Sequence, residues 1–418
     1  MSADQFDARY RLQPHRMGDS VVRRRSRFVV DEELRALAAL ARRPSSIAFF
    51  EEALRHERVP PDARLIGYFC NMIPVEIVYA LGGLPVRLGC GNAALVQPGE
   101  ELLSGEICPL AKASFASFVD PDSLANRCEV VLCAASCDAK RKLGEVLSDW
   151  KPVFMFNLPP EQDSRRYASF AVKELRRLVD FLSRRLGAKL RTRALRKAID
   201  LCARRTQLVR RLQAARARNP QALSIRDLFV IVQASWKGVP LETWLAEAEK
   251  VVAEVEHVQA EPSVRRPRLV LTGAPVLWPN FKVLNLIEQS GGDVVADTLC
   301  SGAQSCFDPV VVEERGRTAL LRALALRYVF ASPCPCFISQ GRRITRVLDL
   351  AKEHKADGVI HYGLRLCQLF DMETYRLSRT LKGAGVPLLN LRTDYSLEDT
   401  EQLRVRIEAF LETLGEKT

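Results

Sequence analysis

Arg64-Leu-Ile-Gly-Tyr-Phe-Cys70-Asn-Met-Ile-Pro74 is the stretch that sets the pattern for the fold of this chain. The short apolar run before Cys70 is typical of a buried parallel strand. Pro74 suits the first turn of a helix, and the paired glycines at 82 and 83 then end that helix before a second strand. Ligands bind beyond the carboxyl ends of parallel strands. Cys70 is therefore either a thiol at a binding edge or a small buried apolar residue.

The same order of elements recurs in the second half of the chain. Arg268-Leu-Val-Leu-Thr-Gly-Ala-Pro275 predicts a strand and a loop, and apolar residues at helical spacing follow from 281 to 287. A second strand over 293–296 leads to Cys300. Further strands are expected at 129–133, 153–157, 358–363 and 386–391. The two halves therefore read as two versions of one α/β design, each with cysteines just past its strands.

Composition is ordinary for a water-soluble globular protein. The chain has 418 residues, of which 47% are hydrophobic and 27% charged, and this length predicts two or three domains. No apolar run approaches the ~20 residues that span a bilayer, and no secretory signal is visible. We therefore expect a cytoplasmic protein without a membrane partner. Its twelve cysteines are then metal ligands or buried thiols rather than disulfides.

Basic residues are concentrated between Arg165 and Arg218, where 18 Lys and Arg face three acidic residues. This balance would suit a nucleic acid or another anionic partner. Leucines at helical spacing, among them Leu175, Leu178 and Leu182, indicate instead an amphipathic helix with a solvated basic face. Aromatic residues for base stacking are scarce in the segment. The solvated face is the favoured interpretation, and no nucleic-acid partner is expected.

The pattern predicts four regions along the chain. An N-terminal arm covers 1–45, with a helix over 31–41, and a first α/β domain covers 46–160. A basic helical region then runs over 161–262, and a second α/β domain over 263–418. Ser396 is expected to cap the last helix, whose apolar positions are Leu403, Ile407 and Leu411.

The cysteines contain no Cys-x-x-Cys pair and no close run of the ferredoxin kind, so local zinc and iron–sulfur motifs are absent. Single cysteines instead follow apparent strand ends, and any site built from them must be assembled by the fold. They are Cys70, Cys108, Cys137, Cys300, Cys334 or Cys336, and Cys367.

Two nucleotide-binding patterns are missing or incomplete. Gly89-Cys-Gly91 resembles part of a dinucleotide fingerprint, but it lacks the third glycine and follows the second strand of its unit. A phosphate-binding Gly-x-x-x-x-Gly-Lys loop is absent from the sequence. Nicotinamide is therefore not expected here, and ATP would be handled by a partner.

Several motifs together resemble the 2-hydroxyacyl-CoA dehydratase D-component family, which also holds benzoyl-CoA reductase subunits and the double-cubane cluster proteins. The first half carries Tyr68-Phe-Cys-Asn-Met-Ile-Pro-Val-Glu76, Cys108-Pro109 and Ser136-Cys-Asp-Ala-Lys-Arg-Lys142. The second half carries Ala296-Asp-Thr-Leu-Cys-Ser-Gly302, Pro333-Cys334, and the stretch from His361 through Cys367 to Tyr395. The resemblance extends from about Gly67 to the last helix.

The resemblance implies two flavodoxin-like parallel-sheet domains joined by a helical segment, with an iron–sulfur cluster in the cleft between them. Three thiolates from each half would hold the cluster: Cys70, Cys108 and Cys137, with Cys300, Cys334 and Cys367. Six ligands resemble a double-cubane [8Fe-9S] site more than a single [4Fe-4S] site. A separate ATP-hydrolysing reductase would supply low-potential electrons to a homodimer that reduces small, multiply bonded molecules.

Alternatives remain open within that resemblance. The chain can instead be a dehydratase or benzoyl-CoA reductase subunit that acts on an acyl-CoA with a sister subunit, or a non-enzymatic electron carrier. Cys336 is a substitute for Cys334, and Cys306 is a further competitor. Cys90, Cys128, Cys133 and Cys202 are expected to be structural. His361 is either a core histidine or a proton donor, and Phe69, Pro109 and Trp278 are candidates for limiting water.

Overall fold

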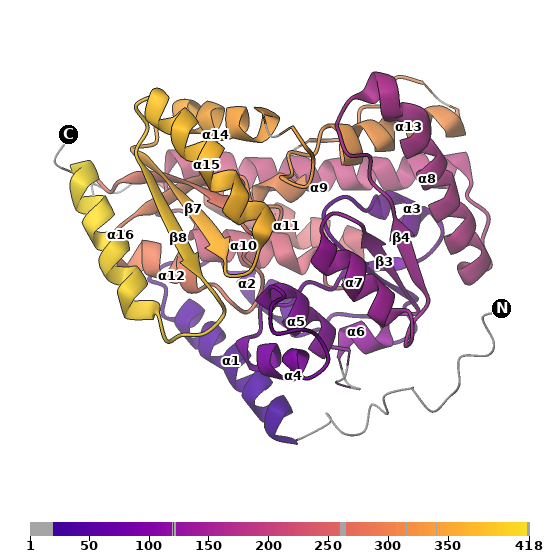
Figure 1. The fold of residues 1–418 in the computed structure, drawn as a ribbon, viewed down its shortest axis with the longest axis horizontal. Coiled ribbons are helices and arrows are strands. Elements are labelled where there is room, and N and C mark those ends of the chain that lie inside the picture. Colours follow the sequence, from indigo (N-terminus) through magenta and orange to yellow (C-terminus); the bar gives the residue numbers. More distant parts are fainter. Residues whose placement is uncertain are drawn as a thin grey trace.

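Each half of the protein contains a four-stranded parallel sheet (Figure 1). The structure is a computed structural model that describes residues 20–118, 120, 123–259, 265–306, 308–314, 316–339 and 341–415. The strand orders are β2-β1-β3-β4 and β6-β5-β7-β8, so the two sheets share one topology. The strands are β1 (Leu65–Phe69), β2 (Leu84–Arg87), β3 (Val130–Ala134), β4 (Val153–Phe156), β5 (Arg268–Gly273), β6 (Asp293–Asp297), β7 (Gly358–Leu364) and β8 (Leu388–Thr393).

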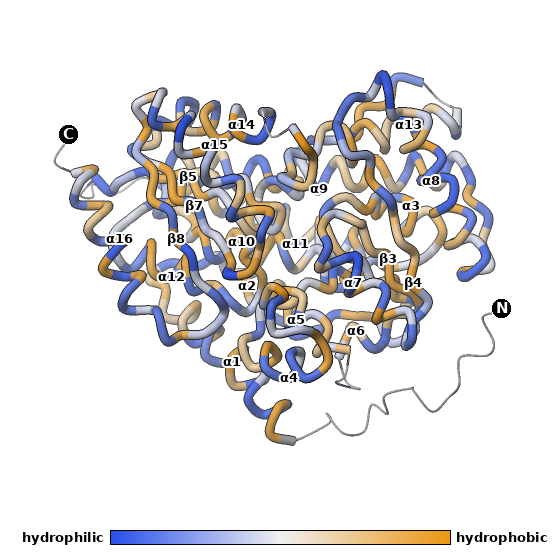
Figure 2. Tube along the Cα trace, in the orientation of Figure 1, coloured by the Kyte–Doolittle hydropathy of each residue, from blue (hydrophilic) through white to orange (hydrophobic). Residues whose placement is uncertain are grey.

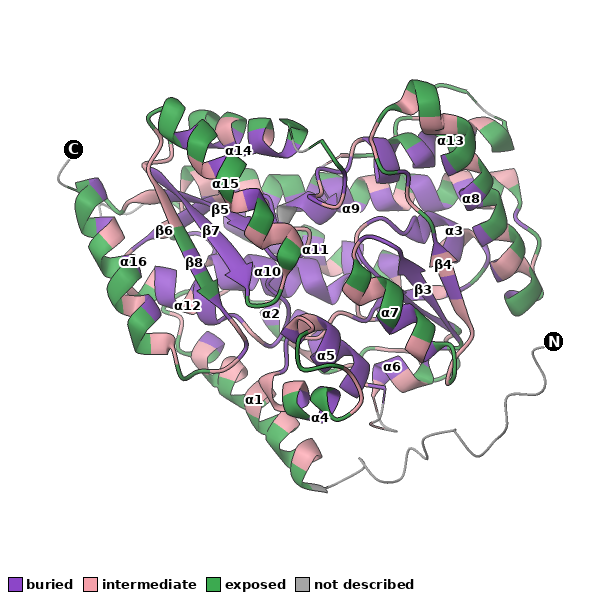
Figure 3. Ribbon diagram, in the orientation of Figure 1, coloured by how far each residue is buried: buried purple, intermediate pink, exposed green. Residues whose placement is uncertain are grey.

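The central strands β1, β3 and β7 are buried along their whole length, and β5 is buried after its first residue, because helices cover both faces of each sheet (Figure 3). The shared order is that of the flavodoxin-like fold, so the predicted class of two α/β parallel-sheet domains is confirmed. In the first sheet β2 lies on one side of β1, and the chain then crosses over to add β3 on the other side. The second sheet does the same, with β6 and β7 on opposite sides of β5. Such switch points are where α/β sheets bind ligands.

Helices make up most of the remaining described chain, and none of those described combines the length and the apolar character needed to cross a membrane. They are α1 (Ser20–Ala38), α2 (Ile47–Leu54), α3 (Val75–Ala80), α4 (Val96–Glu100), α5 (Pro109–Ala116), α6 (Leu124–Arg127), α7 (Asp138–Leu147), α8 (Ser164–Leu186), α9 (Thr192–Arg218), α10 (Ile225–Ala234), α11 (Leu241–Glu256), α12 (Lys282–Gln289), α13 (Arg317–Ala325), α14 (Gly341–Glu353), α15 (Gln368–Gly383) and α16 (Thr400–Gly415). A π-helical turn, η5 (Leu326–Phe330), continues α13.

The basic segment forms α8 and α9, and its leucines are buried as predicted. Part of its charge is balanced by α11, because ion pairs recur every seven residues along the two helices. They join Lys197 to Glu242 at 3.4 Å, Arg204 to Glu249 at 2.9 Å and Arg211 to Glu256 at 2.5 Å. The side chains in the ladder are mostly exposed, which agrees with the interpretation of a solvated helical face.

The helical region joins the two halves. Helix α9 packs on α3 of the first half and on β6 of the second, and it runs across the molecule behind both sheets (Figure 1). Helix α13 follows β6 in the chain but packs on α8, on the side of the first half. The predicted division at residues 45, 160 and 262 stays a prediction, and residue 262 lies outside the described residues.

The predicted bounds of two helices were wrong. The first helix begins at Ser20 and ends at Ala38, because its inward face already includes Val22, Val30 and Leu34. The last helix begins at Thr400, so Ser396 lies outside it. Asp399, directly before α16, accepts a hydrogen bond from Thr393 Oγ1 at 2.7 Å and an ion pair from Lys282 at 2.8 Å.

Other boundaries follow the sequence closely. The alternation of apolar and polar residues along α16 is visible in Figure 2, and its positions 403, 407 and 411 are buried as predicted. Strand β8 starts at Leu388 rather than at 386. Pro387 has no amide hydrogen to donate to the ladder, so it stays outside the strand.

The glycine of the incomplete fingerprint serves contact between the halves. The amide of Gly91 donates to the Trp278 carbonyl at 3.0 Å. A Cβ atom at Gly91 would lie 1.9 Å from the carbonyl oxygen of Leu277, which is far inside van der Waals contact. This close approach explains why the position holds glycine, without any dinucleotide.

Candidate active site at the facing sheet edges

A cavity of about 100 Å³ lies where the carboxyl ends of the two sheets face each other. We call it the thiol cavity. Its walls come from the loops after β1, β2 and β3 in the first half, and after β5, β6 and β7 in the second. It therefore spans both topological switch points. A cavity of this volume has room for several water-sized groups.

All six predicted cysteines line the thiol cavity, three from each half. They are Cys70, Cys108, Cys137, Cys300, Cys334 and Cys367. These cysteines are far apart in the sequence. They come together only because the carboxyl ends of the two sheets face each other. None of them has a disulfide partner.

Three of these cysteines precede helices. Cys108, Cys137 and Cys367 are the N-cap residues of α5, α7 and α15. A helix N-terminus carries free N–H groups and a partial positive charge, and both favour a thiolate or another anion. Cys108 illustrates this: burial raises the pKa of its thiol, while the backbone N–H of Ala111 works against that rise.

The other three cysteines lie in turns. Cys70 follows β1 with a φ of 77°, a left-handed conformation that is uncommon outside glycine. Such residues gather at functional sites, where the surrounding fold holds them. Cys300 lies two residues beyond Thr298 in the turn after β6, and Cys334 lies in the loop before α14.

Burial keeps several of these thiols protonated when no metal is bound. It raises the pKa of Cys367 to about 12, and it raises the pKa of Cys300 despite the nearby Arg87. Cys334 differs from both. A hydrogen bond from Cys336 lowers the pKa of Cys334 to about 7, against the effect of burial. Because metal ligands must be deprotonated, metal binding here would release protons.

Three cations line the cavity, while its described lining includes no carboxylate. Arg87 donates to the Cys300 carbonyl at 2.7 Å and to its sulfur at 3.4 Å, and its guanidinium stacks on Trp236. Burial opposes the charge of Lys140, yet its electrostatic interaction with the surrounding cysteines, Cys70 first, raises the pKa of this lysine overall. Arg343 is paired with Glu373. The lining thus favours an anionic occupant.

Sequence reasoning missed these three cations. The available signal was that Arg87 ends the second predicted strand and that Lys140 lies in the quoted motif after Cys137. Arg343 lies in α14, and nothing in the local sequence distinguishes it from Arg342 beside it. Only the packing of α14 turns Arg343 inward, where it is 3% exposed.

The remaining cysteines lie outside the lining of the cavity. Cys336, the substitute for Cys334, and Cys306, the other competitor, are both absent from it. Cys90, Cys128, Cys133 and Cys202 are absent from it as well. The thiol of Cys128, for example, donates to the Leu124 carbonyl at 3.3 Å within its own half.

Four other predicted residues take separate places. Phe69 lines the thiol cavity, and Pro109 lines the neighbouring groove described next. Trp278 is buried against Phe281 and does not reach the cavity lining. His361 is also buried outside the lining, with its Nε2 3.7 Å from Glu373. That places it behind Arg343 rather than at the cavity.

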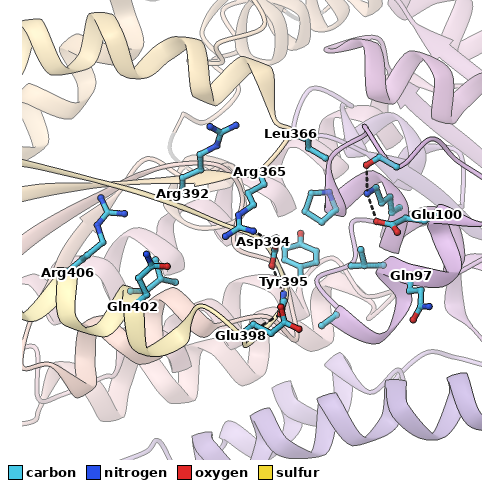
Figure 4. Close-up of a pocket in the computed structure, with 17 residues that line it drawn as sticks. Gln97, Glu100, Arg365, Leu366, Arg392, Asp394, Tyr395, Glu398, Gln402 and Arg406 are labelled. Atoms are coloured by element: carbon cyan, nitrogen blue, oxygen red, sulfur yellow. Dashed lines mark hydrogen bonds and ion pairs between the residues drawn. The ribbon is translucent and has the colours of Figure 1, made fainter.

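An open groove of about 1020 Å³ adjoins the cavity (Figure 4). We call it the arginine groove. Pro109 and Leu366, the neighbours of Cys108 and Cys367, line its inner end. The second half supplies three arginines to the groove, and polar residues of α4 lie across from them. The arginines are Arg365, Arg392 and Arg406, and the residues of α4 are Gln97 and Glu100.

Each groove arginine already has a protein partner. Arg365 lies 3.3 Å from Asp394 and Arg392 lies 2.9 Å from Asp371. Arg406 donates to the Asn390 carbonyl at 2.6 Å. A bound anion would share or displace these partners, as exposed ion pairs permit at small cost.

The lining of the thiol cavity fits an iron–sulfur cluster. Thiolates are the usual ligands of such clusters, and the three cations and three helix N-termini offset the negative charge that the cluster would bring. Within the described residues, no three Cys, His, Asp or Glu side chains meet closely enough to hold a single metal ion. The fit with a cluster therefore rests on the six cysteines that line one cavity and on the positive charge of that lining.

Comparison with known proteins places the chain in a family. The family model described as 2-hydroxyglutaryl-CoA dehydratase, D-component, matches residues 70–414. The protein YjiM of Escherichia coli K12, whose name assigns it provisionally to the dehydratase subunits, is 29% identical over 84% of this chain and 91% of its own length. The beta chain of (R)-phenyllactyl-CoA dehydratase from Clostridium sporogenes is 20% identical over 84% and 92%.

A third relative carries a reductase name. It is one of the subunits of benzoyl-CoA reductase from Thauera aromatica, and it is 24% identical over 59% of this chain and 64% of its own length. The matched region of the family model contains all six cysteines of the thiol cavity. The chain therefore belongs to the 2-hydroxyglutaryl-CoA dehydratase D-component family, among subunits of dehydratases and reductases.

Proposed function

We propose that the chain is an iron–sulfur oxidoreductase whose cluster is held by Cys70, Cys108, Cys137, Cys300, Cys334 and Cys367. The cluster is of the double-cubane [8Fe-9S] type, with three thiolates from each half. A separate ATP-dependent reductase supplies its electrons, and the substrates are small, multiply bonded molecules. The observation that supports this is the gathering of six thiols around one cavity.

When bound, the cluster would store and deliver low-potential electrons, and the protein would set the conditions for this. Arg87, Lys140 and Arg343 place positive charge at the cavity, which makes a more negative occupant easier to hold. Apolar side chains occupy much of the remaining lining, among them Leu143, Leu277 and Phe370. They restrict water, and solvent exposure is one of the factors that set cluster potential.

The first test is the iron and acid-labile sulfide content of the chain, purified without oxygen. About eight irons per chain, with slightly more sulfide, would support the double cubane. About four irons would leave half of the thiols without a cluster and favour the single [4Fe-4S] alternative. Iron near zero after careful reconstitution would overturn the iron–sulfur proposal.

Single substitutions then test the ligands. Cys137→Ser and Cys300→Ser should each lower bound iron sharply, because serine oxygen is a poor ligand for iron in these clusters. Cys128→Ser is the matched control, since Cys128 is buried outside the cavity and a hydroxyl can keep its hydrogen bond to Leu124. If a cavity variant retained the iron content and visible spectrum of the wild type, that cysteine would not be a ligand.

A second candidate function is that of a subunit acting on an acyl-CoA with a sister chain. The arginine groove favours it, because arginines bind phosphates well and the inner end of the groove adjoins Cys108 and Cys367. The CoA substrates in the names of two relatives agree with it. These arginines belong to the second sheet and α16, rather than to the basic helical region.

Two measurements separate the candidates. The reductase proposal expects a stable homodimer in solution without a sister chain, and no saturable binding of coenzyme A. The subunit proposal expects saturable binding of coenzyme A that Arg406→Glu weakens, because the new carboxylate would repel the phosphates. Substrate turnover in the presence of the ATP-dependent reductase, either reduction or loss of water from an acyl-CoA, would distinguish either enzyme from an electron carrier.

A further inference from the structure

A second pocket, of about 290 Å³, lies on another part of the second half. We call it the Arg216 pocket. Residues of α9, α10, β6 and α14 line it, and none of them also lines the thiol cavity. Its volume is at the lower end of the range for small-molecule sites. The proposed iron–sulfur function makes no use of this pocket.

Arg216 distinguishes the pocket, because it is a buried cation with no ion pair to an acidic side chain among the described residues. The side chain is 2% exposed, and its Nη1 donates to the Val294 carbonyl. Its Nε has no hydrogen-bond partner within the described protein. Two other buried arginines have acidic partners: Arg226 lies 2.6 Å from Glu288, and Arg343 binds Glu373. Arg205, which lies outside this pocket, shares with Arg216 a buried Nε without a hydrogen-bond partner in the described protein.

A buried, unpaired charge costs several kcal/mol, so proteins usually neutralise it. Burial lowers the pKa of Arg216 although Glu288, Asp293 and Asp297 act to raise it, whereas ion pairing raises the pKa of Arg43. A guanidinium also presents its N–H groups in a planar fork that matches carboxylate and phosphate oxygens. Because the Nε is itself buried, an occupant of the pocket would meet the other N–H groups of this guanidinium.

The rest of the lining supports an anion as the occupant. Arg210 and His354 add further N–H donors, and Gln213 adds an amide. Two carboxylates also line the pocket. Asp297 already accepts a hydrogen bond from the Leu299 amide at 2.9 Å. The other carboxylate belongs to Glu353, which is exposed. Asp297 helps to stabilise the charge of Arg216, but no acidic side chain accepts a hydrogen bond from its Nε within the described residues.

We propose that the Arg216 pocket binds a small oxyanion, a phosphate or carboxylate group, through the guanidinium of Arg216. The pocket is large enough for a phosphate or a short organic acid. Strand β6 forms one wall of this pocket, and the pocket shares no lining residue with the thiol cavity. The proposal is independent of cluster chemistry.

Thermal unfolding of the full chain tests the site with inorganic phosphate, sulfate and acetate as separate probes. Sodium chloride at matched ionic strength is the reference. A ligand that binds only the folded state raises the unfolding midpoint. We expect a saturable rise with phosphate, with acetate, or with both, and the effective probe identifies the group that the site prefers. A saturable rise with sulfate also supports an oxyanion site.

Variants identify the residue responsible. Arg216→Met should weaken the bound probe by at least about tenfold, since a hydrogen bond to a charged group is lost. Arg204→Met is the matched control, because Arg204 lies on the same helix, is exposed, and pairs with Glu249 outside the pocket. Gln213→Glu is a milder variant that supplies a carboxylate to Arg216, and it should also weaken binding.

Three results would overturn the proposal. One is that no probe raises the midpoint above the chloride reference. Another is an equal rise in wild type, Arg216→Met and Arg204→Met, which would be a general salt effect. If Arg216→Met fails to fold, titration calorimetry measures binding of the probe to Gln213→Glu instead. Binding as tight as that of the wild type would then count against the site. None of these results bears on iron content, so the two proposals fail separately.

Discussion

At the residue scale, Cys334 and Cys336 show how two thiols in one short motif take different roles. Cys334 lines the thiol cavity and Cys336 does not. The hydrogen bond between them favours the thiolate at Cys334 and raises the pKa of Cys336. Two neighbouring buried thiols cannot both ionise easily, so one proton stays between them.

This asymmetry predicts the alkylation behaviour of the protein without metal. The rate of iodoacetamide modification at Cys334 should reach half its maximum near pH 7, where its pKa lies, because the thiolate is the nucleophile. Cys336→Ala removes the donor and should move that midpoint to higher pH. Mass spectrometry of labelled peptides gives both profiles. Cys90, whose pKa burial raises, serves as the internal control, and faster labelling of Cys336 than of Cys334 would contradict the assignment.

At the element scale, the helices are joined by two kinds of ion pair. Those between α9 and α11 are exposed, and water screens them. The pair between Arg226 of α10 and Glu288 of α12 is buried, with side chains 8% and 13% exposed. Glu288 also accepts a hydrogen bond from the Ile225 amide at 3.0 Å, so it caps the start of α10.

These environments predict different costs for the same substitution. Arg226→Met should lower the free energy of unfolding by about 3–5 kcal/mol, since Glu288 would keep a buried charge without its partner. Arg211→Met, in the exposed ladder, should lower it by less than about 1 kcal/mol. Denaturant titration of both variants makes the comparison. Equal losses of unfolding free energy in the two variants would mean that burial of an ion pair does not control how much it contributes to stability.

At the scale of the whole molecule, the thiol cavity exists only while the two halves hold their relative position. Gly91 is one of the contacts that fix it, since its backbone lies directly against Leu277 and Trp278. Helix α1 adds contacts to both halves. Ser26 of α1 accepts hydrogen bonds from Asn92 of the first half, and Glu33 of α1 accepts hydrogen bonds from Asn285 of the second half.

Gly91→Ala should therefore disturb the contact between the halves. The added methyl group must displace backbone at 1.9 Å, and overpacking of this kind costs about 1–3 kcal/mol. Iron content should fall with stability, because both halves supply cavity cysteines. Gly105→Ala is the control, since a Cβ there meets no atom within 4 Å. Unchanged stability and iron in Gly91→Ala would show that the contact does not set the cavity.

Local signals in the sequence were sufficient to define most of the elements. Apolar runs, glycine pairs and prolines place β1 at Leu65–Phe69 and β5 from Arg268, because these signals act over a few residues. The order of the elements then predicted two similar parallel sheets. Helix ends were predicted less accurately: α1 starts eleven residues before the predicted Asp31, since its apolar spacing is sparse.

Contacts between distant residues set the features that no local signal predicted. The six cysteines were named through a resemblance, and the facing sheet edges bring those thiols around one cavity. Nothing in the sequence indicated that Arg343 turns inward or that the Nε of Arg216 is buried without a partner in the described protein. A side chain's charge environment comes from residues tens or hundreds of positions away, so it depends on the tertiary structure and no local pattern can encode it.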